Sequence, residues 1–122
     1  MDALTINEAA TTTGWSPRML RYIEGDGLIS PPRSASDYRL YRPEELQRLR
    51  TLRELLAEHD LSLGDVGFAR RMRRDAELRA AVNAWLEAPA ARPAGIASGD
   101  WLSFEQAKHT ELLAAAANST TN

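Results

Sequence analysis

The sequence predicts a mainly α-helical fold: a winged helix-turn-helix with a small two-stranded wing, followed by C-terminal helices. Three observations lead to this prediction. Two short segments with strong helix-start signals lie close together near the N-terminus, two extended runs separated by prolines come next, and a leucine stripe with helical spacing follows. With 122 residues, of which 43% are hydrophobic and 26% charged, the chain has the size and composition of one small globular domain.

The first two predicted helices are short and adjoin one another. Residues 5–8 read Thr-Ile-Asn-Glu, the pattern of a capping box, and the helix that follows ends in the Thr-Thr-Thr-Gly run at 11–14. Ser16 and Pro17 are a second start signal, for a helix over residues 17–24. On their own, these two helices fit a helix-turn-helix and an ordinary helical hairpin equally well.

The segment after the second helix favours the helix-turn-helix. Residues 28–30 form a short extended run, the two prolines after it forbid a helix, and the Tyr-Arg-Leu-Tyr run at 38–41 alternates like a strand. We expect these runs to pair as a hairpin, with residues 33–37 at its tip. A hairpin beside the second helix would be a wing, and its arginines could reach the phosphate backbone or the minor groove of DNA.

The remainder of the chain is predicted to be helical, with one break. Pro43 opens a third helix, whose apolar stripe consists of Leu46, Leu49, Leu52, Leu55 and Leu56. A weaker signal at 62–65 starts a fourth helix, and Asp75 caps a fifth. Prolines and glycines break the pattern over 88–99, Asp100 caps a last helix from residue 101 to about 117, and 118–122 form a flexible tail.

Positive charge is concentrated in the N-terminal half, although the net charge is −2. Residues 15–53 contain eight arginines and five acidic residues, whereas residues 75–122 contain three basic and six acidic residues. A local basic surface matters more for binding phosphates than the total charge does. The arginines at 70, 71, 73 and 74 fit either a solvated helix end, the reading we favour, or a phosphate contact.

Several classes of function are excluded or disfavoured. The chain has no cysteine, which rules out disulfides, thiolate metal sites and cysteine nucleophiles. His59 and His109 have no partner at metal-ligand spacing, so we expect two surface histidines, no metal and no cofactor. The acid pairs, such as Glu44 and Glu45, lack a nucleophile or histidine in a motif, so we expect no enzyme. No apolar run approaches the ~18 residues of a membrane span and the first residues lack a secretory signal, so we expect a cytoplasmic protein.

A series of motifs at fixed spacing resembles the MerR family of bacterial transcriptional regulators. The motifs are Gly-Trp-Ser-Pro-Arg-Met-Leu-Arg-Tyr at 14–22, Glu24, Gly-Leu-Ile at 27–29, Pro-Arg at 32–33, Tyr-Arg-Leu-Tyr at 38–41 and Leu-Ser-Leu-Gly-Asp-Val at 61–66. The resemblance covers roughly residues 4–68. It implies a DNA-binding domain over 1–70, followed by a helical dimerisation segment over 71–117.

The resemblance also implies a function and a set of contacts. It implies a homodimer on a near-palindromic double-stranded DNA site at a promoter, often with activation by untwisting the promoter for RNA polymerase. The residues expected to bind DNA are Ser16, Arg18, Arg21, Tyr22, Arg33, Tyr38, Arg39 and Tyr41. Arg18 is our candidate for reading base edges, because recognition helices commonly meet bases near their N-terminus. For Tyr41, packing under the wing and DNA contact are equal alternatives.

Some positions depart from the family pattern. Ile23 replaces an aromatic residue, Asp37 stands where the wing usually turns on glycine, and Pro89 and Pro93 interrupt the usual long dimerisation helix. The family's metal-sensing members use cysteines, which this chain lacks, and no small-molecule effector is indicated.

We expect dimerisation between residues 75 and 117, with the apolar candidates Leu78, Val82, Trp85, Trp101, Phe104 and Leu112. The alternative function is a protein-interaction adaptor that retains the fold and docks a partner on Trp85, Trp101 and Phe104.

Overall fold

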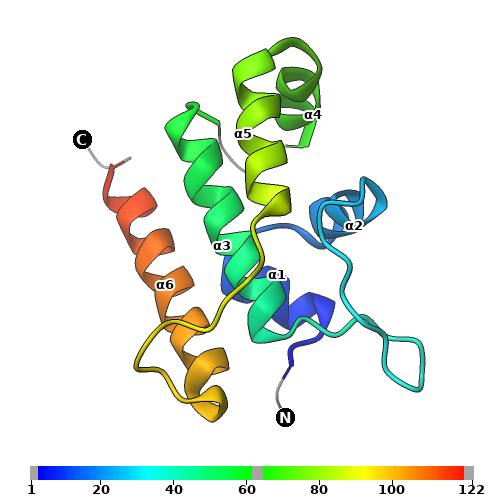
Figure 1. Ribbon diagram of the computed structural model, residues 1–122, viewed down its shortest axis with the longest axis vertical. Helices are drawn as coiled ribbons and strands as arrows, with labels where there is room; N and C mark the ends of the chain where they lie inside the picture. Colours follow the sequence, from blue (N-terminus) through cyan, green and yellow to red (C-terminus); the bar gives the residue numbers. More distant parts are fainter. Residues whose placement is uncertain (1–2, 62–64, 120–122) are drawn as a thin grey trace.

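The protein is a bundle of helices arranged around one central helix (Figure 1). The structure is a computed structural model that describes residues 3–61 and 65–119, with side chains described for 3–61 and 70–115. Its elements are α1 (Ile6–Thr13), α2 (Pro17–Gly25), α3 (Pro43–Glu58), α4 (Asp65–Arg74), α5 (Ala76–Glu87), the 3-10 turn η1 (Ser98–Asp100) and α6 (Trp101–Ser119). The prediction of a mainly helical fold is confirmed.

The start signals of the first two helices act as predicted. The Thr5 amide donates to Glu8 Oε1 at 2.9 Å and the Glu8 amide donates to Thr5 Oγ1 at 3.2 Å, a complete capping box. These hydrogen bonds hold the pKa of Glu8 below its usual value. Gly14 ends α1 with a left-handed φ of 83°, and the Ser16 hydroxyl accepts from the Met19 amide at 3.0 Å to cap α2. The short turn between two capped helices is that of a helix-turn-helix.

The leucine stripe of α3 lies at the centre of the hydrophobic core. Leu46, Leu49, Leu52 and Leu56 are buried, and α1, α5 and α6 all pack against this helix (Figure 1). The core also includes Leu78, Val82 and Trp85 from α5. The structure therefore corrects the expectation that these three side chains meet a second copy of the chain, because the chain buries them in its own core. The core is continuous across residue 70, the boundary that the resemblance implies.

The prediction of a two-stranded wing is wrong, because this segment forms a tight loop without regular strands. No regular strand occurs in 3–61 or 65–119, and the loop is closed by a single bridge between Arg33 and Arg39. The Leu40 amide donates to the carbonyl of Pro32 at 2.8 Å, but Pro31 and Pro32 have no amide hydrogen to extend the ladder. The expected first strand, residues 28–30, instead buries Leu28 and Ile29 in the core. We call residues 32–40 the wing loop.

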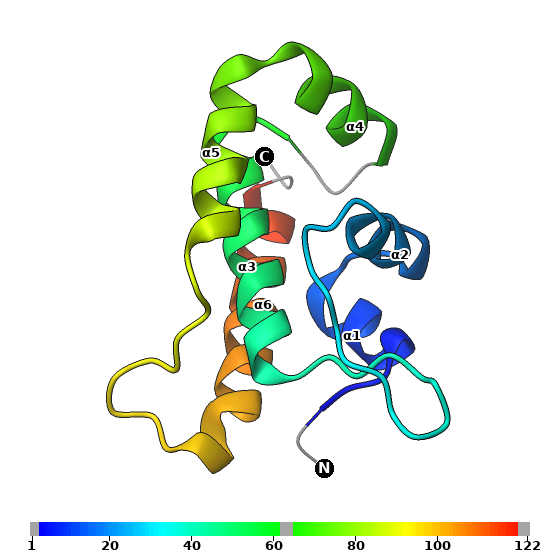
Figure 2. The ribbon, with the colours of Figure 1, turned by 45° about the vertical axis from the view of Figure 1, so that its right-hand side comes forward.

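The connection from α5 to α6 returns along α3. Residues 88–97 contain no helix, and the side-chain amide of Gln47 holds them by bonding both the carbonyl and the amide of Ala91, at 2.7 and 2.9 Å. Arg48 donates to the carbonyl of Ala88 at 2.6 Å. Helix α6 consequently packs along α3 and α1 (Figure 2). None of the helices in 3–61 and 65–119 combines the length and apolar character of a membrane span.

A buried polar cluster joins α6 to α3. Glu105 is fully buried and accepts from Arg50 Nε at 2.8 Å and from Trp101 Nε1 at 3.1 Å. These contacts compensate for the removal of its carboxylate from water. Because Trp101 is 9% exposed with its indole N–H engaged, the structure also corrects its expected place at a dimer interface.

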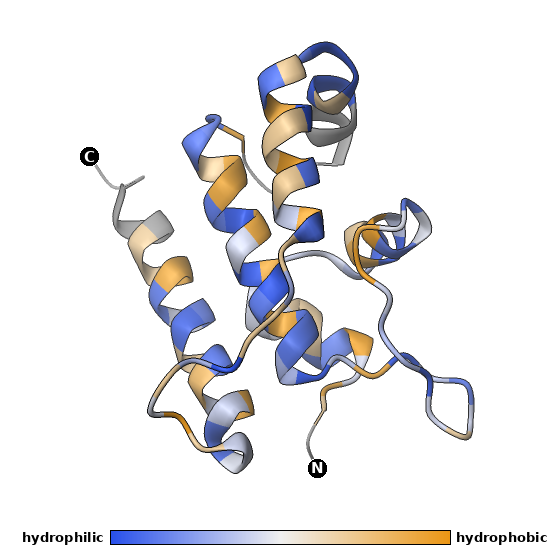
Figure 3. Ribbon diagram, viewed as in Figure 1, coloured by the Kyte–Doolittle hydropathy of each residue, from blue (hydrophilic) through white to orange (hydrophobic). Residues whose placement is uncertain are grey.

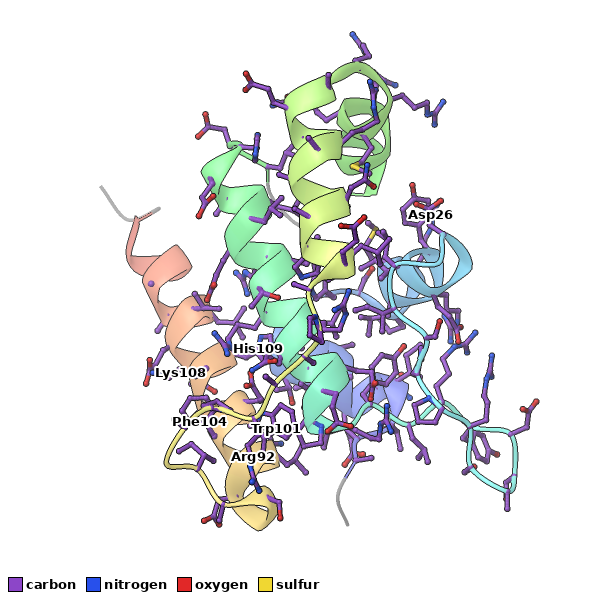
Figure 4. The ribbon with its side chains drawn as sticks, in the orientation of Figure 1. Asp26, Arg92, Trp101, Phe104, Lys108 and His109 are labelled. Atoms are coloured by element: carbon purple, nitrogen blue, oxygen red, sulfur yellow. The ribbon has the colours of Figure 1, made fainter. Side chains whose placement is uncertain are left out.

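His109 is fully buried one turn further along α6, so the expectation of a surface histidine is wrong there (Figure 4). Its Nε2 lies 2.8 Å from the carbonyl oxygen of Leu46, which accepts only, so Nε2 carries the proton. Its Nδ1 has no hydrogen-bond partner among the residues that the structure describes. Burial lowers the pKa of His109 from 6.5, with Arg50 and Arg53 acting in the same direction and Glu105 and the Leu46 carbonyl opposing them.

The buried histidine predicts a loss of stability on mild acidification. The unfolded chain takes up a proton near pH 6.5 while folded His109 stays neutral, so stability is fully present above that pH. The free energy of unfolding then falls by up to about 1.4 kcal/mol per pH unit as the pH drops toward the lower folded pKa. Urea titrations between about pH 8 and pH 5.5 measure this slope. We expect the dependence of the unfolding free energy on pH to be weaker in His109→Gln and to persist in the control His59→Gln. Equal slopes in wild type and His109→Gln would contradict this account.

Candidate nucleic-acid interface

Helix α2 has one buried and one exposed face. Met19, Leu20 and Ile23 are no more than 2% exposed and join the core. The opposite face carries the exposed side chains of Arg18, Arg21 and Tyr22. Helix α2 packs chiefly against α1, and Figure 3 shows hydrophilic residues on its outer side. The helix thus presents cationic and hydrogen-bonding groups on a rigid backbone.

The turn before α2 is held by buried contacts. Trp15 is buried, and its backbone amide donates to Thr13 Oγ1 at 3.2 Å. Arg53 of α3 donates to the Thr13 carbonyl at 3.1 Å. The angle between α1 and α2 is therefore fixed from inside the molecule, and Ser16 acts there as the helix cap.

The wing loop projects on the same side of the molecule as α2 (Figure 2). The Ser34 amide donates to the Tyr38 carbonyl at 2.8 Å, which places Arg33 opposite Arg39 and leaves Tyr38 70% exposed. Asp37 turns the tip with a φ of 66°, a left-handed conformation in which glycine is less strained. The structure thus explains physically why a wing of this shape favours glycine at this position.

Glu24, in the last turn of α2, joins the helix to the wing loop. Its Oε1 accepts from Arg39 Nε, and its Oε2 lies 3.5 Å from Arg33 Nη2. In the sequence, Glu24 is part of a family motif and has no predicted role. The signal was an acidic residue beside the arginines of an expected DNA-binding face, where a carboxylate needs a cationic partner.

Tyr41 belongs to the core, which corrects its expected contact with DNA. The side chain is 1% exposed, and its backbone forms two hydrogen bonds of 2.8 Å with Leu4. In the described part of the chain, the hydroxyl has no hydrogen-bond partner. Burial raises the pKa of Tyr41, the charge of Glu24 raises it further, and the nearby arginines lower it. Of the two alternatives, the structure supports packing under the wing.

The arginines of α3 and its N-cap, Arg42, hold the fold together instead of forming a free basic surface. Arg42 pairs with Glu44 and Glu45, Arg50 with Glu54 and Glu105, and Arg48 lies over the Trp85 ring and donates to carbonyls of Leu86 and Ala88. Burial lowers the pKa of Arg48 and Arg53. The arginine excess in residues 15–53 therefore overstates the charge available to a ligand.

The C-terminal end of α4 carries exposed arginines, one of which, Arg73, acts on Tyr22 of α2. Arg71 pairs with Asp75 at 3.2 Å and donates to the His59 carbonyl, so it stabilises the helix end. Arg73 and Arg74 are exposed, and Arg73 lies close enough to lower the pKa of Tyr22, although burial and Asp26 raise it overall. Figure 2 shows α4 above α2 on the same side of the molecule.

The structure brings together Ser16, Arg18, Arg21, Tyr22, Arg33, Tyr38 and Arg39 on α2, its cap and the wing loop. It corrects the docking surface of the alternative adaptor, since Trp85 and Trp101 are 9% exposed and their indole N–H groups bond Thr51 and Glu105. Phe104 and Leu112 remain partly exposed. In the part of the chain that the structure describes, no three histidine or acidic side chains form a group that could hold a metal ion.

A helix-turn-helix whose second helix presents arginine and tyrosine beside an arginine-bearing loop defines the class of the protein as that of helix-turn-helix DNA-binding proteins. The family model described as MerR HTH family regulatory protein matches residues 4–68, more than half of the sequence, and the chain belongs to this family. The family expected from the sequence motifs is confirmed.

Curated relatives match part of the chain. It is 45% identical over 51 residues to the HTH-type transcriptional regulator HmrR of Sinorhizobium medicae, covering 41% of this chain and 35% of that protein. Identity and coverage are the same for the heavy metal-dependent transcription regulator 2 of Rhizobium meliloti. An uncharacterized HTH-type transcriptional regulator of Pseudomonas aeruginosa, PA4778, is 42% identical over 67 residues, 52% of this chain and 48% of that protein. The chain thus spans a third to a half of these relatives, and no solved structure matches it.

The left-handed conformation of Asp37 predicts an unusual order of stabilities at the wing tip. Asp37→Ala is expected to lower the free energy of unfolding by about 1 kcal/mol, because alanine is strained at positive φ. Asp37→Gly avoids this strain and is expected to stay within about 0.5 kcal/mol of wild type or above it. Urea unfolding measures both, with the neighbouring Ser36→Ala as the control. If Asp37→Ala were as stable as Asp37→Gly, the tip would not depend on this backbone conformation.

Proposed function

We propose that the protein is a DNA-binding transcriptional regulator that places α2 in the major groove of a promoter site. The observation that carries the proposal is the outer face of α2, where Arg18, Arg21 and Tyr22 are exposed on a helix whose other face is buried. A helix of this kind fits the width of the major groove. The transcriptional roles in the names of the relatives support the same function.

The exposed side chains are assigned to bases or phosphates by position. Arg18 lies in the first turn of α2 and is proposed to bind a guanine edge, which accepts two hydrogen bonds from one guanidinium. Arg21 and Tyr22, further along the helix, are proposed to bind phosphates. Tyr38 and Arg39 of the wing loop are proposed to bind the backbone beside the same groove. Arg73, close to Tyr22, extends this set at its edge.

We further propose that the protein acts as a homodimer on a near-palindromic site. Two copies would place their α2 helices about 34–36 Å apart, or a multiple of that, on one face of the DNA. Phe104 and Leu112, partly exposed on α6, are the remaining apolar candidates for the contact between copies. Regulation is proposed to occur at RNA polymerase, with activation by untwisting of the promoter as one form of output.

The proposal is tested by selecting DNA from a random pool with the purified chain. A spaced inverted repeat among the enriched fragments supports dimeric recognition, and sedimentation with that DNA gives the number of chains bound. Affinity is expected to fall steeply with salt as the arginines release counterions from the phosphates. Failure of the chain to retain any DNA at low salt, where phosphate binding is strongest, would refute the proposal.

Removing the Arg18 side chain is expected to reduce specificity. Arg18→Ala should weaken binding to the selected site by about 1–3 kcal/mol and relax the preference at one base position in each half-site. The matched control is Arg92→Ala, which removes the same charge from an exposed residue near the start of α6, across the molecule from α2 (Figure 4). Titrations with the selected site and with random DNA measure both variants. Equal effects of the two substitutions would show that Arg18 does not read a base.

A further inference from the structure

Glu24 places a carboxylate at the proposed DNA face, where it opposes binding to any sequence. A negative charge near phosphates raises their electrostatic potential energy and lowers affinity in general. Its side chain is 20% exposed and lies between α2 and the wing loop. Without this carboxylate the protein would bind DNA of any sequence more tightly. A role of Glu24 in recognition therefore has to concern specificity and not affinity.

The geometry of Glu24 suits it to hold two arginines at once. Its two carboxylate oxygens contact different residues, Arg39 through Nε and Arg33 through Nη2. These two arginines lie opposite each other where the wing loop closes. One carboxylate in the last turn of α2 therefore holds both sides of the loop, and the guanidinium groups keep further N–H donors for a phosphate.

We propose that Glu24 is a positioning residue that sets the orientation of the wing loop relative to α2, and so determines how strongly the protein discriminates its site from random DNA. This inference rests on the proposed function. Helix α2 packs chiefly against α1, and the wing loop has no regular strands in 3–61 to stiffen it. The contact from Glu24 is consequently a direct link between the two proposed contact elements.

The physical basis of the proposal is preorganisation. Long side chains that are ordered before binding lose less conformational entropy when the complex forms. A specific complex needs α2 and the wing loop in one relative arrangement, whereas random DNA offers phosphates that arginines can reach in many arrangements. Loss of the contact should therefore weaken specific binding relative to non-specific binding, by about tenfold for two long side chains.

The test compares two variants that remove the same charge at the same end of α2. Glu24→Gln removes the carboxylate that holds the wing loop, and Asp26→Asn removes an exposed carboxylate two residues further along the chain (Figure 4). Both are expected to bind random DNA more tightly. Only Glu24→Gln is expected to reduce the ratio of specific to random affinity, by about tenfold. Glu24→Asp, which keeps the charge but shortens the reach, should reduce this ratio as well.

A second readout does not depend on DNA. Trypsin cleaves after arginine, so the rates of cleavage after Arg33 and Arg39, mapped by mass spectrometry, report on opening of the wing loop. Glu24→Gln is expected to be cut at least about threefold faster at these two bonds than Asp26→Asn or wild type. Thermal unfolding of each variant shows whether the rest of the fold is intact.

The outcomes separate this inference from the proposed function. If Glu24→Gln behaves like Asp26→Asn in both the affinity ratio and cleavage, the positioning role is overturned while the proposed function stands. A wild-type chain that binds no DNA sequence overturns the proposed function, and the role of Glu24 in recognition with it. In Arg33→Ala/Arg39→Ala protein, Glu24→Gln should change the ratio no further; an undiminished effect there would also overturn the proposal.

Discussion

Burial of one leucine-rich face of α3 is the interaction on which the rest of the structure depends. Each fully buried leucine contributes about 1.5–3 kcal/mol relative to an exposed one, and four leucines of α3 are no more than 1% exposed. Helices α1, α5 and α6 all pack on this helix, and α2 packs in turn against α1. The position of the proposed DNA-binding face therefore follows from packing at α3, a helix that contributes no residue to that face.

The arginines of this chain fall into two groups, those that make contacts inside the fold and those that lie at the proposed DNA-binding face. On α3, arginines bind carboxylates, carbonyls and an aromatic ring, and so join α3 to α5, α6 and the turn before α2. On α2 and the wing loop, arginines lie at the surface or at its edge. The planar guanidinium, with five donors, suits both tasks because it can satisfy several acceptors at once. A chain with a net charge of −2 can in this way present a cationic face, because Glu45, Glu54 and Glu105 pair with arginines of α3 and its N-cap, away from the outer face of α2.

Local signals in the sequence predicted the parts of the fold that depend on neighbouring residues. The caps at Thr5, Ser16 and Asp75 and the spacing of the leucines in α3 are set within one or two helical turns, and all were found. The failures involve contacts between distant parts of the chain. His109 reads as a surface residue until α6 is seen to pack on α3, and Leu78 and Val82 read as an interface until α5 is seen to complete the core.

In the candidate site, too, the sequence predicted local features but not a contact between distant residues. Exposure of Arg18, Arg21 and Tyr22 follows from the helical period of α2, which local sequence encodes. The contact of Glu24 with the wing loop spans fifteen residues and depends on where two prolines end the hairpin ladder, which periodicity does not reveal. Because prolines withhold the amides that would make a regular sheet, the orientation of the loop rests on side-chain contacts. A binding element built in this way is adjustable by single substitutions, whereas a wing made of paired strands would have its orientation fixed by backbone hydrogen bonds.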